Sequence, residues 1–185
     1  MTHRTRSLLA ALLLSAIFTA EGASVAVAGD YQKLDRESAE ALRILTKGNE
    51  AAKLLAGKAR AVLVFPSIVK AGLMFGGQLG DGTLFRGGKA VGHYNSMAAS
   101  YGLQAGVQVF GYALFFMNEE ALKYLDNSDG WELGVGPSLV VVDAGVGKSL
   151  TTTTATQDVY AFIFDQKGLM AGLGIQGSKI SKLAD

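Results

Sequence analysis

The sequence predicts an α+β fold in which N-terminal helices pack against a strongly curved, barrel-like antiparallel sheet. One short internal helix lies between the strands in the sequence. Helical patterns occupy the start of the expected domain, and short apolar runs fill the rest. Turns of a few residues separate these runs without helical crossovers, which favours antiparallel pairing. The chain has 24 glycines in 185 residues, nearly twice the usual share of about 7%. Many lie in strand candidates, and a sharply bent sheet uses glycine at its kinks.

The first 28 residues have the pattern of a secretory signal peptide. Arg4 and Arg6 precede an uncharged apolar run at 8–18, and the sequence Ala-Val-Ala at 26–28 is a cleavage site of small residues. The apolar run is too short for a membrane span, which requires about 20 residues. We therefore expect a single domain over 29–185, exported to the periplasm or secreted, and associated at most peripherally with a membrane.

Two helices are predicted at the start of the domain. The first covers 31–46, because four apolar residues recur on one stripe at a period of 3.6: Leu34, Ala41, Leu42 and Leu45. Gly48 ends this helix, and Asn49 caps a second helix over 50–56.

The strand candidates begin at Ala61. The continuous apolar run 61–65 predicts a buried strand that stops at Pro66. Two further candidates surround Asp81-Gly82, which is a hairpin signal; they cover 72–78 and 82–86.

The second half of the chain continues the strand pattern. Residues 103–109 alternate between apolar and polar or glycine positions, and the strand continues to Met117. Asn118 then caps the short helix 119–125. The remaining strand candidates are 131–135, 139–142, 146–154, 159–164 and 169–176.

Several kinds of chemistry are excluded or disfavoured by residue content. The chain has no Cys and two His, of which only His93 lies in the expected domain, so disulfides and thiolate chemistry are excluded and a histidine-based site has one candidate. The P-loop-like ending 145–149 lacks its first glycine, since Val142 stands there. The G-x-G-x-x-G match at 172–177 has only eight residues after it, too few for a βαβ unit. We expect no cofactor, metal, nucleotide or enzymatic activity.

Charge is balanced overall and uneven along the chain. Without residues 1–28 the chain holds 15 Lys and Arg against 15 Asp and Glu, which argues against nucleic-acid binding. Residues 47–89 hold seven basic and two acidic residues, whereas 90–185 hold five basic and nine acidic residues. This asymmetry indicates an anionic partner on one side, with an ordinary solvated surface as the alternative.

Four blocks of sequence resemble one known family. They occur in the family's order and read KARAVLVFPSIVKAGLMF at 58–75, SYGLQAGVQ at 100–108, LGVGPSLVVVDAGVG at 133–147 and VYAFIFDQKGLMAGLGIQGS at 159–178. Each block alone is weak, but together they span most of the expected domain. The chain is similar in these blocks to the SYLF domain family.

This resemblance implies a non-enzymatic domain that binds membrane lipids. Eukaryotic relatives recognise phosphoinositides, and some bind and bundle actin. The expected export favours anionic phospholipid headgroups or acyl chains of an envelope membrane as ligands here. The matching basic positions are Lys58 and Lys70, with Lys47, Lys53 and Arg60 as neighbours of like charge.

Three alternatives stay open. Phe75, Phe115 and Phe116 either line an acyl site or pack in the core. As an alternative to lipid binding, the domain is a protein-interaction or structural module of the envelope, with an envelope protein as its partner. By analogy with the family, such a module would resemble an actin-binding scaffold. An enzyme that uses His93 is the third reading.

Overall fold

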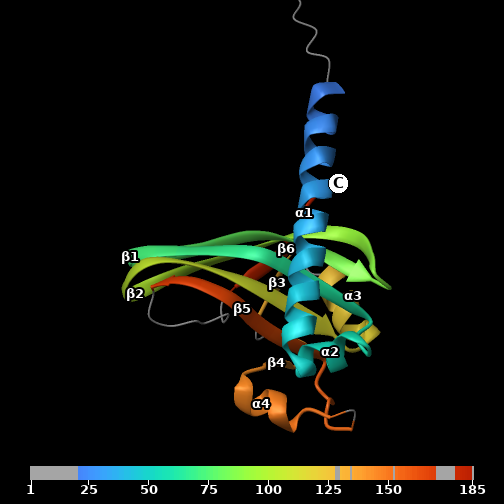
Figure 1. The fold of residues 1–185 in the computed structure, drawn as a ribbon. Coiled ribbons are helices and arrows are strands. Elements are labelled where there is room, and N and C mark those ends of the chain that lie inside the picture. The colour runs from blue at the N-terminus through green and yellow to red at the C-terminus, as the bar shows by residue number, and fades with distance from the viewer. Residues whose placement is uncertain (1–20, 128–129, 134, 152, 170–177, 185) are drawn as a thin grey trace, which may run out of the picture.

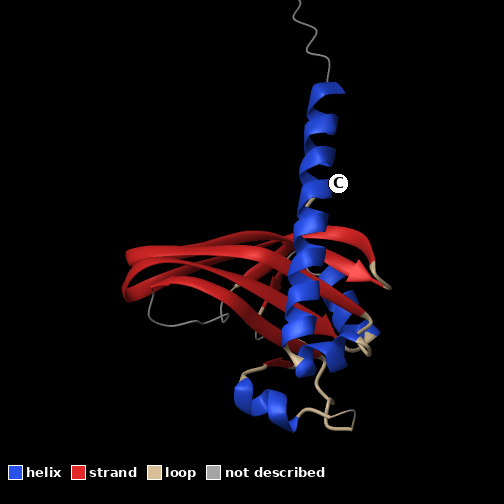
Figure 2. Ribbon diagram, in the orientation of Figure 1, coloured by secondary structure: helices blue, strands red, loops and turns tan. Residues whose placement is uncertain are grey.

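A computed structural model describes residues 21–127, 130–133, 135–151, 153–169 and 178–184. It confirms the α+β class with N-terminal helices and a curved, barrel-like sheet (Figures 1 and 2). The elements in chain order are α1 (Glu21–Gly48), α2 (Glu50–Ala56), β1 (Ala61–Arg86), β2 (Lys89–Phe116), α3 (Glu119–Asn127), β3 (Trp131–Glu132), β4 (Leu139–Val141), α4 (Ala144–Ser149), β5 (Val159–Leu169) and β6 (Lys179–Lys182).

The sheet is built around one long two-stranded ribbon, formed by β1 and β2 paired antiparallel from Ala61↔Phe116 to Arg86↔Lys89. Gly87 and Gly88 make its turn, with φ of 57° and 77°. Positive φ at both central residues is the geometry of the two-residue hairpin turn that matches strand twist. The hairpin predicted at Asp81-Gly82 is therefore wrong, since this pair lies within β1, opposite Asn95 and Tyr94.

Irregular strand pairing allows β1 to continue through positions that were expected to end a strand. Pro66 was predicted to stop the first strand, but β1 continues through it. The register shifts between Phe65 and Ile68, and such a bulge removes the need for a ladder hydrogen bond from the proline nitrogen. A second shift lies between Leu73 and Phe75, where the chain is rich in glycine.

The ribbon folds back on itself, so that residues 75–86 of β1 run beside residues 61–72. A Cβ added at Gly72 would lie 2.7 Å from Gly76 Cα, and one added at Gly82 would lie 2.6 Å from the Val64 carbonyl oxygen. Only glycine permits backbones to approach this closely. The two halves of β1 therefore meet at a seam, and the bend at 72–76 forms the far end of the ribbon, which we call the bent end.

Four short strands extend the sheet on both halves of the ribbon. β5 pairs antiparallel with the second half of β2, and β6 pairs antiparallel with residues 94–97 of β2. β3 pairs with β6, and β4 pairs with β5. The β4–β5 pair is parallel, so the expectation of antiparallel pairing throughout fails at this one pair. β6 was not predicted, because four residues are too few to show a period.

Side chains alternate between two cores on opposite faces of the sheet. The inner face packs against α3 and Trp131 and includes Leu63, Phe65 and Tyr112. The outer face packs against α1, α2 and the segment around α4. Phe116 belongs to the inner core and Phe115 to the outer core, so these two rings pack as core residues and line no acyl site.

α1 lies across the outer face at the seam (Figure 2). Its Ser38 hydroxyl donates to the Val64 carbonyl at 3.3 Å, in the first half of β1. Its Asp35 accepts a hydrogen bond from the Thr83 hydroxyl at 3.0 Å, in the second half. α1 thus forms hydrogen bonds with both halves of the folded ribbon.

The caps predicted for the short helices are confirmed, and one predicted strand is wrong. Asn49 and Asn118 accept hydrogen bonds from the backbone of the first turns of α2 and α3. Residues 146–154 were predicted as a strand, but α4 covers Ala144–Ser149. Asp143 accepts from the Gly145 and Val146 backbone nitrogens at 2.8 Å, and this local cap overrides the β-propensity of the valine and threonines.

Three other predictions fall largely or wholly beyond the described part of the chain. The strand candidate 169–176 coincides with β5 only at Leu169, and the glycine motif 172–177 lies within the undescribed stretch 170–177. The predicted signal peptide has only residues 21–28 in the described range, at the start of α1.

Candidate functional site

The outer face near the bent end of the ribbon exposes apolar side chains. Their exposed fractions are 45% for Val69, 71% for Phe75, 53% for Leu79, 57% for Met97 and 57% for Val107. Leu79 and Met97 are directly opposite each other on β1 and β2. We call these five residues the apolar surface. Clustered apolar side chains of this size on a protein surface mark a contact with a protein or a membrane.

The ribbon around this surface carries almost no charge. No Asp, Glu, Lys or Arg occurs in residues 71–80 or in residues 90–118. A strand that faces water on one side normally alternates apolar inward and charged or polar outward positions. The apolar surface breaks that rule over a stretch of both strands.

The inner face at the same end is polar instead. Four side chains there are buried, and Gln78 Nε2 donates to Ser178 Oγ at 2.7 Å. Farther along the inner face, burial raises the pKa of Tyr112 well above its usual range, so its hydroxyl stays protonated. The bent end is therefore polar inside and apolar outside, whereas the rest of the sheet packs an apolar core on each face. The four buried inner residues are Lys70, Gln78, Ser96 and Gln108.

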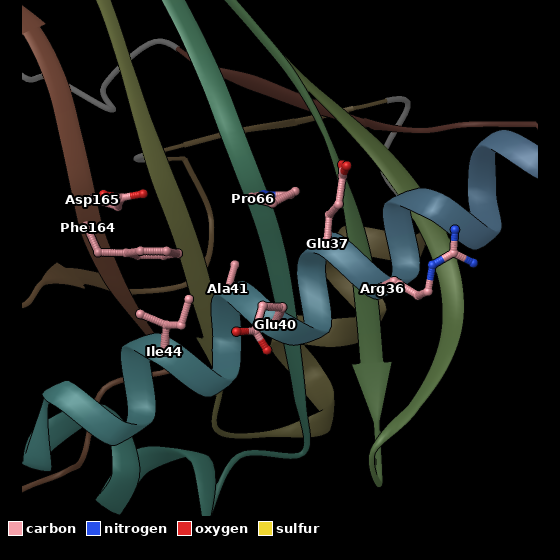
Figure 3. Close-up of a pocket in the computed structure, with 8 residues that line it drawn as sticks. All are labelled: Arg36, Glu37, Glu40, Ala41, Ile44, Pro66, Phe164 and Asp165. Carbon is pink, nitrogen blue, oxygen red and sulfur yellow. The ribbon is translucent and has the colours of Figure 1, made fainter.

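A groove of about 350 Å³ lies on the outer face between α1 and the sheet (Figure 3). Ala41 and Ile44 of α1 and Pro66 and Phe164 of the sheet give it apolar walls. Charged residues edge it, and several are already paired with neighbours: Glu37 with Lys33, Glu40 with Arg43 and Asp165 with Lys167.

The tightest of these pairs is that of Arg43 and Glu40. The guanidinium Nε lies 2.7 Å from a carboxylate oxygen. This hydrogen bond lowers the pKa of Glu40 and raises that of Arg43. The three acidic residues at the rim of the groove are therefore each paired with a basic neighbour.

The five basic residues predicted to bind lipid do not form one group. Lys47 ends α1, Lys53 lies on α2, and Lys58 and Arg60 lie between α2 and β1; all four are exposed at the same end of the molecule. Lys53 pairs with Glu50 at 3.6 Å. Lys70 is separate from them, since it is 8% exposed on the inner face of β1.

Two further cavities adjoin the exposed basic residues. Two cavities of about 500 and 540 Å³ lie between α2 and α4 and share Glu50, Ala51 and Gly147 in their linings. Lys53, Lys58 and Lys148 also line them. Lys148 belongs to the P-loop-like stretch, so this motif contributes a lysine to the basic end of the molecule.

His93 contacts a carboxylate, as a catalytic histidine would, and it also takes part in a junction between three parts of the fold. Its Nε2 lies 2.9 Å from Asp35 Oδ1, and its ring stacks on Tyr31 with centroids 4.1 Å apart. The Tyr31 hydroxyl donates to the Ala184 carbonyl, and the Leu183 nitrogen donates to the His93 carbonyl. The junction joins α1, β2 and the C-terminal tail. No group of three metal-ligating side chains occurs in the part of the chain described here.

Replacing Asp35 with alanine is expected to loosen α1 from the sheet. The change removes the acceptor of Thr83, which is fully buried, and an unsatisfied buried hydroxyl costs about 1–3 kcal/mol. Amide hydrogen exchange across α1 measures the effect. As a control, Glu37→Ala removes only an exposed ion pair, with an expected loss below about 0.5 kcal/mol; equal effects of both changes would contradict the assignment.

Sequence reasoning missed the apolar surface, although one signal was present. The lack of charge over residues 90–118 is visible in the sequence, but which face of each strand is exposed depends on the fold-back and on α1. Among the described residues, no helix has both the length and the apolar character needed to span a bilayer.

Comparison with known families agrees with the four blocks. Residues 97–185 match the family model Ysc84, described as "Las17-binding protein actin regulator". Three of the four blocks fall inside this range, and the match confirms the resemblance to the SYLF family over it. No curated protein matches the chain.

Proposed function

Because residues 97–185 match the model of the Ysc84 (SYLF) family, we propose that this protein is a non-enzymatic module that binds the surface of a lipid membrane through its apolar surface. The observation that carries the proposal is the patterning of the bent end, which is polar inside and apolar outside. A lipid-facing strand pair shows the same pattern, since its neighbours on the outer side are hydrocarbon.

Backbone pairing is unbroken along the part of the ribbon that carries Leu79 and Met97, so this part can enter the membrane interface with its backbone groups paired. Leu79 and Met97 lie on paired strands whose register is continuous from Phe75 to Leu84. Backbone pairing within the ribbon meets the main requirement for contact with hydrocarbon. Each half-exposed apolar side chain that leaves water contributes about 1 kcal/mol, so five of them support reversible peripheral binding.

Anionic lipids add a second, salt-dependent contribution in this proposal. Lys47, Lys53, Lys58 and Arg60 are exposed at the α2 end, and a basic residue near an anionic surface contributes about 1 kcal/mol. Arg60 precedes the bend at Gly72 by twelve residues, or about 40 Å of extended strand. The two regions therefore contact a membrane as separate points.

We also propose that the protein is exported and acts at an envelope membrane, peripherally from the periplasm or after secretion. The support is the signal-peptide pattern of residues 1–28. The described side-chain contacts of α1 with the sheet and tail begin at Tyr31, so cleavage after Ala28 would leave them intact.

Flotation of the full chain with vesicles tests lipid binding. We expect binding to neutral phosphatidylcholine vesicles that persists at high ionic strength, and tighter binding when phosphatidylglycerol is added at low ionic strength. Binding only to anionic vesicles, lost entirely in salt, would overturn the role of the apolar surface. Absence of binding to either kind would overturn the lipid proposal.

A protein-binding module is the second candidate function. The family model is described by a protein partner and by actin regulation, and an exposed apolar surface also fits a protein contact. Crosslinking in intact envelopes, with a protein recovered in stoichiometric amount and no co-purifying lipid, would favour this candidate over lipid binding.

A further inference from the structure

The groove between α1 and the sheet is continuous with the apolar surface of the bent end. Val107 of that surface, Val109 and Gly111 are alternate residues of β2, so they lie on the same, outer face of the sheet. Val109 is paired with Val69, which also belongs to the apolar surface. The ring of Phe164, which lines the groove, lies over Gly111, because a Cβ there would collide with this ring. Apolar positions therefore lead along the outer face from the bent end to the groove.

Two strand bulges lie at the groove. The register of β1 with β2 shifts at Pro66, and the register of β5 with β2 shifts at Asp165. Both residues line the groove. Bulges redirect side chains and are common beside functional sites. Asp165 also has a φ of 49°, which non-glycine residues rarely adopt and which occurs preferentially at ligand-binding positions. The sheet is thus irregular on both sides of Gly111, where the groove forms.

The walls of the groove offer apolar contact and no unpaired polar group. Ile44 is 54% exposed, and Figure 3 shows it directed from α1 toward the ring of Phe164. The acidic residues at the rim are paired with basic neighbours. Among the described residues, no groove-lining side chain holds a buried polar atom that lacks a hydrogen-bond partner. A ligand inside the groove is therefore held by its apolar surface.

We propose that this groove receives one acyl chain of a membrane lipid, which enters over Val69 and Val109 from the bent end. The proposal rests on the function proposed above, because contact of the bent end with a membrane brings lipid to this entrance. The groove volume of about 350 Å³ lies within the range of small-ligand sites, about 300–1,000 Å³. A protein segment would bring backbone N–H and C=O groups that need partners, whereas a hydrocarbon chain needs none.

Titration of the full chain with single-chain phosphocholines, below their micelle concentrations, tests the groove without a bilayer. Hexanoyl, octanoyl and decanoyl lysophosphatidylcholine share one headgroup and differ only in chain length. We expect saturable binding in calorimetry, with a dissociation constant that falls about twofold to fourfold per added methylene; fourfold corresponds to about 0.8 kcal/mol for a fully buried methylene. Equal affinities for the three chains would show that the headgroup drives binding and would overturn the proposal.

Two variants decide whether the chain lies in the groove. Ala41→Leu places apolar atoms inside the groove and is expected to weaken decanoyl binding about tenfold, because the chain loses its space. Non-specific apolar association predicts tighter binding in this variant, and that result would overturn the proposal. Ile44→Gln removes part of an apolar wall at an exposed position and is expected to weaken binding about threefold to tenfold; full affinity in this variant would count against the site as well.

Ala39→Leu is the matched control for the added leucine. Ala39 is exposed on α1 and does not line the groove, so this variant should bind all three lipids as the unmodified protein does. Leucine and glutamine both favour helices, and the unfolding midpoint without lipid verifies that each variant folds. Equal weakening of binding in Ala39→Leu and Ala41→Leu would place the chain outside the groove and overturn the proposal.

Vesicle flotation separates failure of this inference from failure of the proposed function. A protein that floats with phosphatidylcholine vesicles but binds none of the three monomeric lipids would overturn the acyl site alone, leaving the groove to an apolar side chain of a protein partner. A protein that binds these lipids with the expected dependence on chain length but does not float would support the site and overturn the membrane contact of the bent end.

Discussion

Replacing Gly82 with valine is expected to lower the free energy of unfolding by about 3 kcal/mol, the upper part of the range for overpacked cores. Gly82 is buried, and a Cβ there would lie 2.6 Å from both the Val64 carbonyl oxygen and Phe65 Cδ1. The obstacle includes backbone, so the two halves of β1 must separate at the seam. Denaturant unfolding monitored by circular dichroism measures the loss.

Gly77 on the same strand is the matched control. A Cβ there would meet only the Ala98 carbonyl oxygen, at 3.4 Å, and Gly77 is exposed. Gly77→Val is therefore expected to change stability by no more than about 0.5 kcal/mol, since valine suits a strand. A similar loss in both variants would show that strand glycines act through flexibility and not through the seam.

The strong curvature of the sheet was predictable, because glycine weakens a flat strand and its excess in strand patterns is typical of a sheet that bends sharply. The contacts that produce this curvature were not predictable. Gly72 and Gly82 look alike in sequence, yet the first lies at the bend and the second at the seam. Their roles depend on contacts between residues that are far apart in the ribbon, which no local pattern reports.

Turns and helix caps also differ in how far local sequence predicts them. The caps at Asn49 and Asn118 were predicted because a cap needs only its own helix. Asp81-Gly82 was read as a turn because the pair is a strong local hairpin signal, but the ribbon keeps its pairing there and turns at Gly87-Gly88. Continuous cross-strand pairing outweighed the local preference.

The candidate site was predicted only in part. The exposed basic residues of the α2 end follow from charge counting, and four of the five lie there. Lys70 was grouped with them by its nearness in sequence, whereas the alternation of β1 places it on the inner face. The apolar surface could not be predicted, because apolar strand positions read as core until the covering element is known, and α1 leaves the bent end uncovered.

The double variant Leu79→Thr, Met97→Thr is expected to reduce binding to neutral vesicles about tenfold to thirtyfold. The two side chains are partners on the outer face of the ribbon and more than half exposed. Threonine keeps a strand-compatible branched side chain and removes about 1 kcal/mol of apolar burial at each position, which together give that change in affinity. Flotation with phosphatidylcholine vesicles at high ionic strength measures it.

The control is the double variant Val91→Thr, Val141→Thr. These valines are 52% and 41% exposed, and both positions lie away from the bent end. Val91 is near the hairpin turn on β2, and Val141 is on β4. Vesicle binding should be unchanged in this variant, and both double variants should unfold at the midpoint of the unmodified protein because the replaced side chains face solvent. Equal losses of binding in the two would mean that lipid contacts exposed apolar residues without preference, and the bent end would no longer be the membrane-binding element.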